Sequence, residues 1–272
     1  MSDIQNRWYQ SLTDSLLNNI IIIICIFLTI FGSLIGSFIN VVISRLPEKG
    51  KFLSDSRSHC PVCKQVIRWY DLFPVISWIF LLGKCRDCKA NISVRYPLIE
   101  LTGAISAIAC FWRFGFEYQA IIVFAMTMIL LAIALIDFDT SEIPDSLNIA
   151  IVPFAIASIW FIPNITLLSH FIGLFTISLP MLLLTMAIPG AFGGGDIKLM
   201  AVCGFLLGWQ QSLLSFFIAL LIGGSIAVYL MLSGKRKRGE HMVFGPALCV
   251  GVTVSMYFGK EIIDLYLQFL LF

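Results

Sequence analysis

Long apolar stretches recur along this chain of 272 residues, and they constrain its fold more than any other feature. Hydrophobic residues make up 59% of the sequence and charged residues only 12%, about half the charged share of an ordinary soluble domain. A helix needs about 20 mainly apolar residues to cross the hydrocarbon core of a bilayer. The sequence therefore predicts a protein that spans a membrane several times.

Eight stretches have the composition of membrane spans. They cover residues 17–43, 98–116, 118–136, 147–163, 167–189, 197–210, 211–233 and 243–258, and the boundary at residues 208–211 is the least distinct. The runs are too long and too continuously apolar for the strands of a membrane barrel. We expect an all-α polytopic membrane protein of about eight transmembrane helices, whose first apolar run is a span and not a cleaved signal peptide.

The distribution of lysine and arginine predicts the orientation of these spans. Residues 44–97 hold ten of them against four acidic residues, and a second basic cluster occupies residues 235–238. If residues 44–97 lie in the cytoplasm, the loops 137–146, 190–197 and 234–242 lie there too. With Lys198, which directly follows residue 197, the cytoplasmic side then holds 15 of the 18 basic residues. We interpret the second cluster as an anchor at the lipid surface, because no other feature of the sequence supports binding of nucleic acid.

The long loop between the first two spans carries two C-x2-C pairs. Four thiolates from two tight turns suit a closed, structural zinc site, and a metal would stabilise a loop too small to build its own core. The predicted ligands are Cys60, Cys63, Cys85 and Cys88. A redox dithiol and simple buried thiols are the alternatives. The remaining cysteines lie singly in apolar runs and are interpreted as small hydrophobic residues.

Acidic residues occur at two places where the apolar runs begin or end. Asp137 and Asp139 end the third span, and Asp196 opens the sixth, so all three belong to the cytoplasmic ends of their helices. Acids inside a membrane are costly and usually functional. Two carboxyl groups that share a proton can act as base and acid on one water molecule. Alternatively, the first cluster is a polar turn with Asp145 or Ser146 as the next N-cap, and Asp196 caps its own helix.

Three consecutive glycines, Gly193, Gly194 and Gly195, precede Asp196. Glycine lets backbones approach closely and adopts positive φ angles without strain. We therefore expect an extended substrate to lie against these glycines while Asp196 reaches its scissile bond. The alternative is a simple turn.

Taken together, these motifs resemble the bacterial type IV prepilin peptidases, aspartyl proteases of the GxGD class. The matching stretches cover about residues 30 to 250: GSFINVVISRLP (36–47), CPVC (60–63), IRWYDLFPVISWIFLLGKCRDC (67–88), RYPLIELTGA (95–104), LIDFDTSEIPDSLN (135–148), GGGDIKLM (193–200) and FGPAL (244–248). The middle residue of the GxGD motif is Gly194, so the aspartate and both flanking glycines are kept.

The resemblance implies a bifunctional enzyme of the bacterial inner membrane. Such enzymes remove the leader of prepilins and type II secretion pseudopilins at the cytoplasmic face. Many then N-methylate the new terminus with S-adenosylmethionine, for which this sequence shows no dinucleotide-type glycine motif. The resemblance also implies a methylation-associated part at residues 1–97 and a peptidase domain at 98–272.

The resemblance further identifies the catalytic aspartates as Asp196 and one residue of the first cluster. Asp137 precedes Ile143 by six residues, as the single aspartate of shorter relatives does, so we choose Asp137 and take Asp139 as second choice. Residues two apart on a helix point to different faces, so both are not expected to reach the same water. The sequence does not indicate an oligomeric state.

Two other functions are compatible with acids in membrane spans. A proton-coupled transporter would use them as a proton relay, and a noncatalytic scaffold of a pilus or secretion machine would dock through the cysteine loop. Neither accounts for the two aspartate motifs together.

Overall fold

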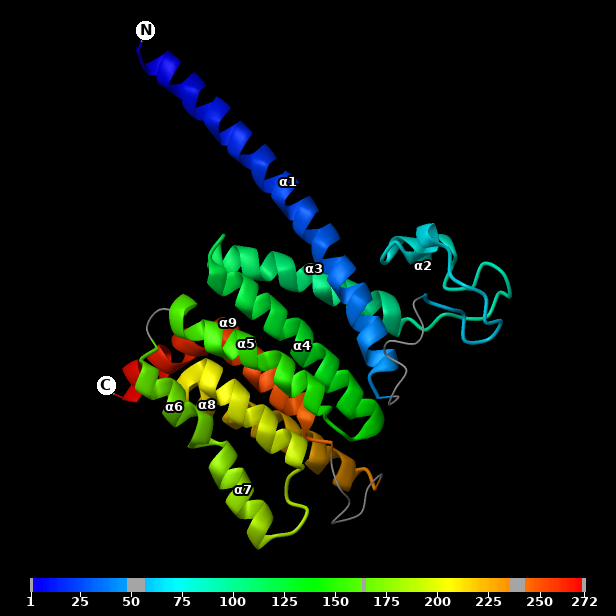
Figure 1. Ribbon diagram of the computed structural model, residues 1–272. Coiled ribbons are helices and arrows are strands. Elements are labelled where there is room, and N and C mark those ends of the chain that lie inside the picture. The colour runs from blue at the N-terminus through cyan, green and yellow to red at the C-terminus, as the bar shows by residue number, and fades with distance from the viewer. Residues whose placement is uncertain (1, 48–56, 163–164, 235–242, 271–272) are drawn as a thin grey trace. The chain divides into compact units, whose positions relative to one another are not determined.

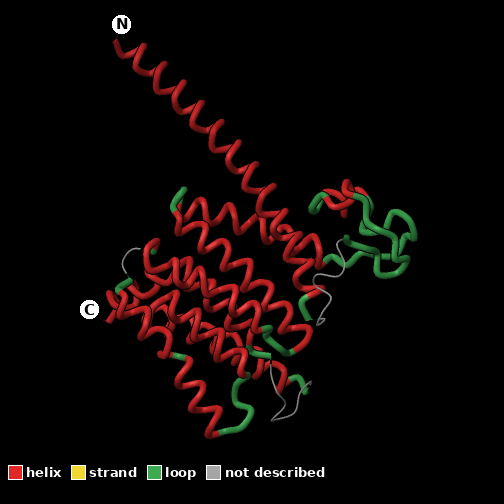
Figure 2. Tube along the Cα trace, viewed as in Figure 1, coloured by secondary structure: helices red, strands yellow, loops and turns green. Residues whose placement is uncertain are grey.

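Helices form almost all of the regular structure of the protein (Figure 1). The computed structural model describes residues 2–47, 57–162, 165–234 and 243–270. Figure 2 shows no strand among the described residues. Within these ranges the only extended pairings are two isolated antiparallel bridges, His59 with Val66 and Lys84 with Asn91. The predicted all-α fold is thus confirmed for the described residues. The basic cluster at 235–238 lies outside them.

The chain forms two compact units. The first comprises Met1–Asn40 and Asp55–Trp112, and the second comprises Val41–Ser54 and Arg113–Phe272. The first unit contains most of α1 (Ser2–Arg45), η1 (Trp69–Leu72), α2 (Ile76–Phe80) and most of α3 (Arg95–Phe114). The second contains α4 (Tyr118–Thr140), α5 (Asp145–Phe161), α6 (Leu167–Thr176), α7 (Ser178–Ala187), α8 (Gly194–Leu232) and α9 (Gly245–Leu270).

Glycines allow α1 and α3 to pack backbone against backbone in the first unit. A Cβ atom built on Gly32 would lie 2.8 Å from the carbonyl carbon of Gly103, and one on Gly36 would lie 2.7 Å from Cα of Glu100. Real side chains do not fit at such distances. Small residues four apart are typical of membrane helices, which associate by close van der Waals contact rather than by hydrophobic burial.

Helix α4 lies at the core of the second unit. More than half (56%) of its most apolar window is buried, and α5 and α9 pack against it. Its interior side chains include Met126, Leu130, Ile133 and Ile136, none of which is more than 1% exposed. This packing carries the helix to its last turn, where the acidic cluster begins.

Helix α8 consists of two limbs that fold back on each other at Gly208. Gly208 has φ 74° and ψ 172°, which is not helical. Gly204 and Ser212 would be about 12 Å apart along a continuous helix. Instead, a Cβ atom on Gly204 would lie 3.0 Å from Oγ of Ser212. The chain therefore reverses within residues 208–211, where the sequence placed the boundary between the sixth and seventh spans.

Several helices have the length and composition of membrane spans. Five qualify among the described residues: Asn18–Arg45, Arg95–Phe114, Tyr118–Thr140, Leu167–Ala187 and Gly194–Leu232; the apolar helix α5 is shorter. The last of the five contains both limbs of α8, and Leu167–Ala187 contains α6 and α7. These helices are consistent with a multi-pass membrane protein. The number of eight crossings stays a prediction.

Candidate functional site

Asp137 lies in the last turn of α4 and is buried, with 6% of its surface exposed. Ser141 then adopts a left-handed conformation with φ 56° and ends the helix. Asp139, two residues further along, is exposed. The two carboxyl groups therefore face different surroundings, as helical geometry predicts. Only Asp137 faces the interior of the bundle.

The carboxyl group of Asp137 sits against the first residue of α9. A Cβ atom built on Gly245 would lie 2.9 Å from Cγ of Asp137 and would overlap its Oδ2. Any side chain at residue 245 would displace the carboxylate from its present position. The FGPAL stretch thus contributes Gly245 to the surroundings of Asp137, a role that sequence reasoning did not assign to it.

Asp196 lies in the first turn of α8 and is also buried, with 8% of its surface exposed. The N–H of Gly193 donates a hydrogen bond of 3.3 Å to its Oδ2. The alternative role considered for Asp196, capping its own helix, is therefore present in the structure. A carboxylate in the first turn is also favoured by the partial positive charge of the helix N-terminus.

The three glycines before Asp196 have three different environments. A Cβ atom on Gly195 would lie 2.8 Å from Cβ of Ile143, whereas one on Gly194 would meet open space. Gly193 has φ −72° and ψ 145°, and none of the three has a positive φ. The positive φ angles that glycine permits are therefore not used in this run. Gly195 instead allows the start of α8 to pack against the turn that follows Asp137.

The carboxyl groups of both aspartates lie near one buried thiol of α9. Cys249 is 3% exposed and lies within electrostatic range of the carboxyl groups of Asp137 and Asp196. Four residues separate it from Gly245, so the two residues lie on the same face of α9. The structure thus brings the ends of α4 and α8 to one end of α9. Two buried carboxyl groups converging from different helices can exchange protons with a single water molecule.

Two charged side chains in the first turns of α8 and α5 are exposed. Lys198 Nζ forms an ion pair of 2.8 Å with Oδ1 of Asp145, and both side chains are more than half exposed. Pro144 occupies the N-cap position of α5, so the alternative in which Asp145 or Ser146 caps this helix is wrong. The pair joins the first turns of α5 and α8, and exposed pairs of this kind contribute little to stability.

The four cysteines of the long loop form one cluster in the first unit. Their sulfur atoms all lie within 4.8 Å of one another, and Sγ of Cys60 is 3.8 Å from Sγ of Cys88. Tetrahedral zinc with Zn–S bonds of about 2.3 Å places its sulfur ligands about 3.8 Å apart. The cluster could hold a metal ion, and its spacing fits zinc.

The two C-x2-C pairs adopt the same local structure. In each, the residue after the second cysteine, Lys64 or Lys89, has a positive φ near 60° and donates its N–H to the carbonyl of the first cysteine. One of the antiparallel bridges closes each turn. The backbone N–H groups of Cys63 and Val62 lower the pKa of the Cys60 thiol to about 6. The first of the two turns therefore favours a thiolate at Cys60, which is the form that binds metal.

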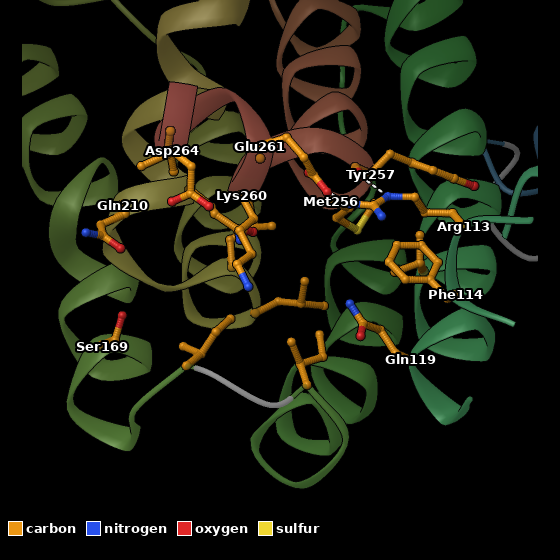
Figure 3. A pocket seen from close by; sticks show the side chains of 18 of the residues that line it. Arg113, Phe114, Gln119, Ser169, Gln210, Met256, Tyr257, Lys260, Glu261 and Asp264 are labelled. Atoms are coloured by element: carbon orange, nitrogen blue, oxygen red, sulfur yellow. Dashed lines mark hydrogen bonds and ion pairs between the residues drawn. The ribbon is translucent and has the colours of Figure 1, made fainter. Parts of the chain in front are cut away.

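A polar cavity of about 660 Å³ lies at the other end of the second unit (Figure 3). It lies where α3 ends, α4 begins and α8 reverses, beside the second half of α9. Arg113 donates to the carbonyl of Tyr257 at 2.9 Å and pairs with Glu261. Lys260, Gln119 and Gln210 also line it (Figure 3). Because α4 runs from this cavity to Asp137, the two sites lie at opposite ends of that helix.

Comparison with known proteins relates the chain to two protein families in sequence order. The model of the Bacterial Peptidase A24 N-terminal domain matches residues 30–114, and that of the Type IV leader peptidase family matches residues 124–228. No solved structure matches the chain.

Curated proteins similar to this chain share one name, prepilin leader peptidase/N-methyltransferase. The protein of Stutzerimonas stutzeri is 34% identical over 223 residues, covering 80% of this chain and 76% of its own length. That of Bacillus subtilis is 31% identical over 212 residues, covering 78% and 86%. That of Pseudomonas aeruginosa is 32% identical over 228 residues, covering 78% and 75%. The similarity thus spans both units.

Proposed function

Because the chain belongs to the type IV leader peptidase family, we propose that it removes the leader peptide of prepilins and pseudopilins and then methylates the new N-terminus. The observation that carries the peptidase part is the convergence of Asp137 and Asp196, both buried, at the Cys249 end of α9. The names of the relatives carry the methyltransferase part. Neither the convergence of the two aspartates nor the names of the relatives favours a transporter or a noncatalytic scaffold.

Peptide cleavage in this proposal is general acid–base chemistry on water. One ionised carboxylate takes a proton from a water molecule, whose oxygen attacks the scissile carbonyl carbon. The other carboxyl group, protonated, donates a hydrogen bond to the carbonyl oxygen as negative charge develops there. We assign these two roles to Asp137 and Asp196 rather than to the second choice, Asp139, because the side chain of Asp139 is exposed.

The start of α8 supplies the place for the substrate backbone. Gly194 is exposed, and a Cβ atom there would meet open space. An extended peptide can therefore approach Gly193–Gly195 next to Asp196, and we assign these glycines to substrate binding. The close packing of Gly195 on Ile143 would keep this segment fixed during the approach.

The proposed topology has eight crossings of the bacterial cytoplasmic membrane, with the aspartates at the cytoplasmic face. The reversal of α8 at Gly208 supports this number of crossings, because the two limbs of α8 are then two separate crossings. A prepilin enters the bilayer with a basic leader in the cytoplasm and an apolar helix in lipid. Its cleavage point then lies at the depth of the two aspartates.

The cysteine cluster is proposed to bind a structural zinc ion. All four positions would be occupied by Cys60, Cys63, Cys85 and Cys88, so no open position remains for a reacting group. Zinc would fix two turns that otherwise have few buried contacts. The methyl donor is proposed to be S-adenosylmethionine, used by the N-terminal part, residues 1–97, while residues 98–272 form the peptidase.

The experiment that tests both activities uses detergent-purified protein and a synthetic prepilin. Mass spectrometry would follow loss of the leader and, with S-adenosylmethionine present, a mass gain of one methyl group. Cleavage without methylation would remove the second half of the proposal. An intact prepilin after prolonged incubation with folded protein would overturn the first half.

A further inference from the structure

Exposed apolar side chains are concentrated in one segment of the cysteine-rich loop, residues 69–82, which contains η1 and α2. Large apolar or aromatic side chains are exposed at eight of its 14 positions: Trp69, Tyr70, Leu72, Phe73, Ile76, Ile79, Phe80 and Leu82. An exposed apolar surface of this kind normally marks a site of contact with a membrane or with another protein.

The loop does not need these side chains for its own packing. The indole N–H of Trp78 donates to the carbonyl of Ile92 at 3.2 Å, and a Cβ atom on Gly83 would lie 2.8 Å from Cζ2 of the Trp78 ring. Pro74 is also buried. Trp78 and Pro74 therefore point inward, and the turns on either side are fixed by the cysteine cluster. The exposed side chains of residues 69–82 have no such role within the loop.

The charges in and around residues 69–82 suit the surface of a bilayer. Asp71 is the only charged residue in the segment, and the guanidinium of Arg86 donates to it through Nε at 2.9 Å and through Nη2 at 2.6 Å. Arg68 directly precedes the segment, Lys84 closely follows it, and both are exposed. An apolar face with basic residues beside it is typical of segments that lie in a membrane interface with anionic lipids, where tryptophan and tyrosine are also enriched.

A hydrogen bond sets the level of the segment along α3. The N–H of Val75, just before α2, donates to Oε2 of Glu100 at 2.7 Å. Glu100 is five residues beyond Arg95, the first residue of α3, and so lies about 7.5 Å along that helix. At this level α3 already exposes Leu98 and Leu101, as a membrane span exposes apolar side chains to lipid. Interfacial helices reach about 5–10 Å into the boundary between headgroups and acyl chains. Val75 is therefore held at the depth to which such a segment inserts.

We infer that residues 69–82 are an interfacial membrane anchor. The apolar side chains of η1 and α2 insert among the lipids of the leaflet in which α3 begins, while Arg68 and Lys84 stay at the headgroups. The anchor holds the cysteine cluster at the membrane surface. It is a property of the loop and its lipid, and it does not depend on the proposed enzymatic function.

Photo-crosslinking to lipid tests the anchor directly. Full-length, zinc-containing protein would carry p-benzoylphenylalanine in place of Phe80 and would be placed, without any prepilin, in nanodiscs of phosphatidylethanolamine and phosphatidylglycerol. Irradiation should join residue 80 to a phospholipid, which mass spectrometry detects as an added lipid mass. The same label in place of Ile105, which is exposed on α3, gives the reference yield of a lipid-facing site.

Val62 provides the matched control. It is an apolar residue of the first C-x2-C turn, is 68% exposed against 82% for Phe80, and lies outside the anchor. The yield of lipid adduct at residue 80 should exceed that at residue 62 by at least about tenfold, because burial of a phenylalanine side chain shifts an equilibrium by about that factor. The zinc content of the labelled proteins should equal that of the wild type, as a check that the loop is folded.

A second variant tests whether the anchor inserts as one unit. With the label in place of Trp69, Phe80→Asp should lower the yield of lipid adduct several-fold, because a carboxylate replaces an apolar contact and is repelled by anionic headgroups. Val62→Asp makes the same change of charge outside the anchor and should leave the yield at residue 69 unchanged.

Four results would overturn the inference. They are a missing lipid adduct at residue 80 beside a full yield at residue 105, equal yields at residues 62 and 80, an unchanged yield at residue 69 in Phe80→Asp, and an adduct of residue 80 with a second copy of the chain in place of lipid. Displacement of lipid by added prepilin, with the label then joined to prepilin, would make the surface a substrate site and the anchor wrong. Leader cleavage is not measured in any of these experiments, so the proposed function stands in each case.

Discussion

The carboxylate of Asp137 lies against Gly245, at the first residue of α9. A Cβ atom on residue 245 would come within 2.9 Å of Cγ of Asp137, so the carboxylate takes up space that any other residue would fill. The first N–H groups of a helix have no partner within the helix, and its N-terminus carries a partial positive charge. Asp137, which belongs to α4, thus lies at the N-terminus of α9, where a carboxylate is favoured. Asp196 lies at the N-terminus of its own helix, α8, where a carboxylate is favoured for the same reason.

Substitution of Gly245 tests this relationship. Gly245→Ala should displace the Asp137 carboxyl group and lower leader cleavage by about 100-fold, because small misplacements of a reacting group have effects of that size. Gly224→Ala in α8 is the matched control, since a Cβ atom there meets nothing within 4 Å. It should cleave normally. Mass spectrometry of a synthetic prepilin gives the rates, and wild-type cleavage by Gly245→Ala would show that the contact is not needed.

The neighbouring glycines before Asp196 should differ sharply. Gly195→Ala must push against Ile143, at 2.8 Å, and should shift the start of α8 and impair cleavage by at least about tenfold. Gly194→Ala meets open space and should fold as well as the wild type. Thermal unfolding and cleavage would be measured for both. Equal loss of folding stability in the two variants would contradict the packing described for Gly195.

Removal of one cysteine should release the metal. Purified wild-type protein should contain about one zinc per chain, and Cys63→Ser should contain much less, because a closed four-thiolate site loses one of its ligands. Limited proteolysis should then cut the loop faster. Cys110→Ser, a buried cysteine outside the cluster, controls for the loss of a thiol. Zinc-free wild-type protein with an equally resistant loop would refute the zinc assignment.

The sequence predicted those elements of the fold whose structure depends on a single local property, such as apolar length or the spacing of two cysteines. Apolar length indicated the helices, and the spacing of Cys60, Cys63, Cys85 and Cys88 indicated a cluster, because each C-x2-C turn is a local structure. The reversal at Gly208 was only a weak boundary, since a glycine inside an apolar run is compatible with a continuous membrane helix. Glycine permits the positive φ at this residue but does not require it, so the residue type alone does not predict the reversal.

The candidate site depends on contacts that no single segment contains. Asp137 and Asp196 could be selected as acids in apolar runs, but Gly245 and Cys249 lie far along the chain, and a glycine and a lone cysteine carry no local signal of their own. The ion pair of Lys198 with Asp145 was missed for the same reason. The reason for glycine at residue 195 was also not visible in the sequence, because close packing against Ile143, and not turn geometry, requires it.

The proposed peptidase requires that two buried carboxyl groups exchange protons, so isosteric replacement of each is the most direct test. Asp137→Asn and Asp196→Asn keep size and polarity but remove the exchangeable proton. Leader cleavage, measured by mass spectrometry on folded protein, should fall by orders of magnitude in both. Asp139→Asn, whose side chain is exposed, should cleave at nearly the wild-type rate. Loss of cleavage in Asp139→Asn but not in Asp137→Asn would move the first acid to residue 139, and full cleavage by Asp196→Asn would contradict the aspartyl peptidase altogether.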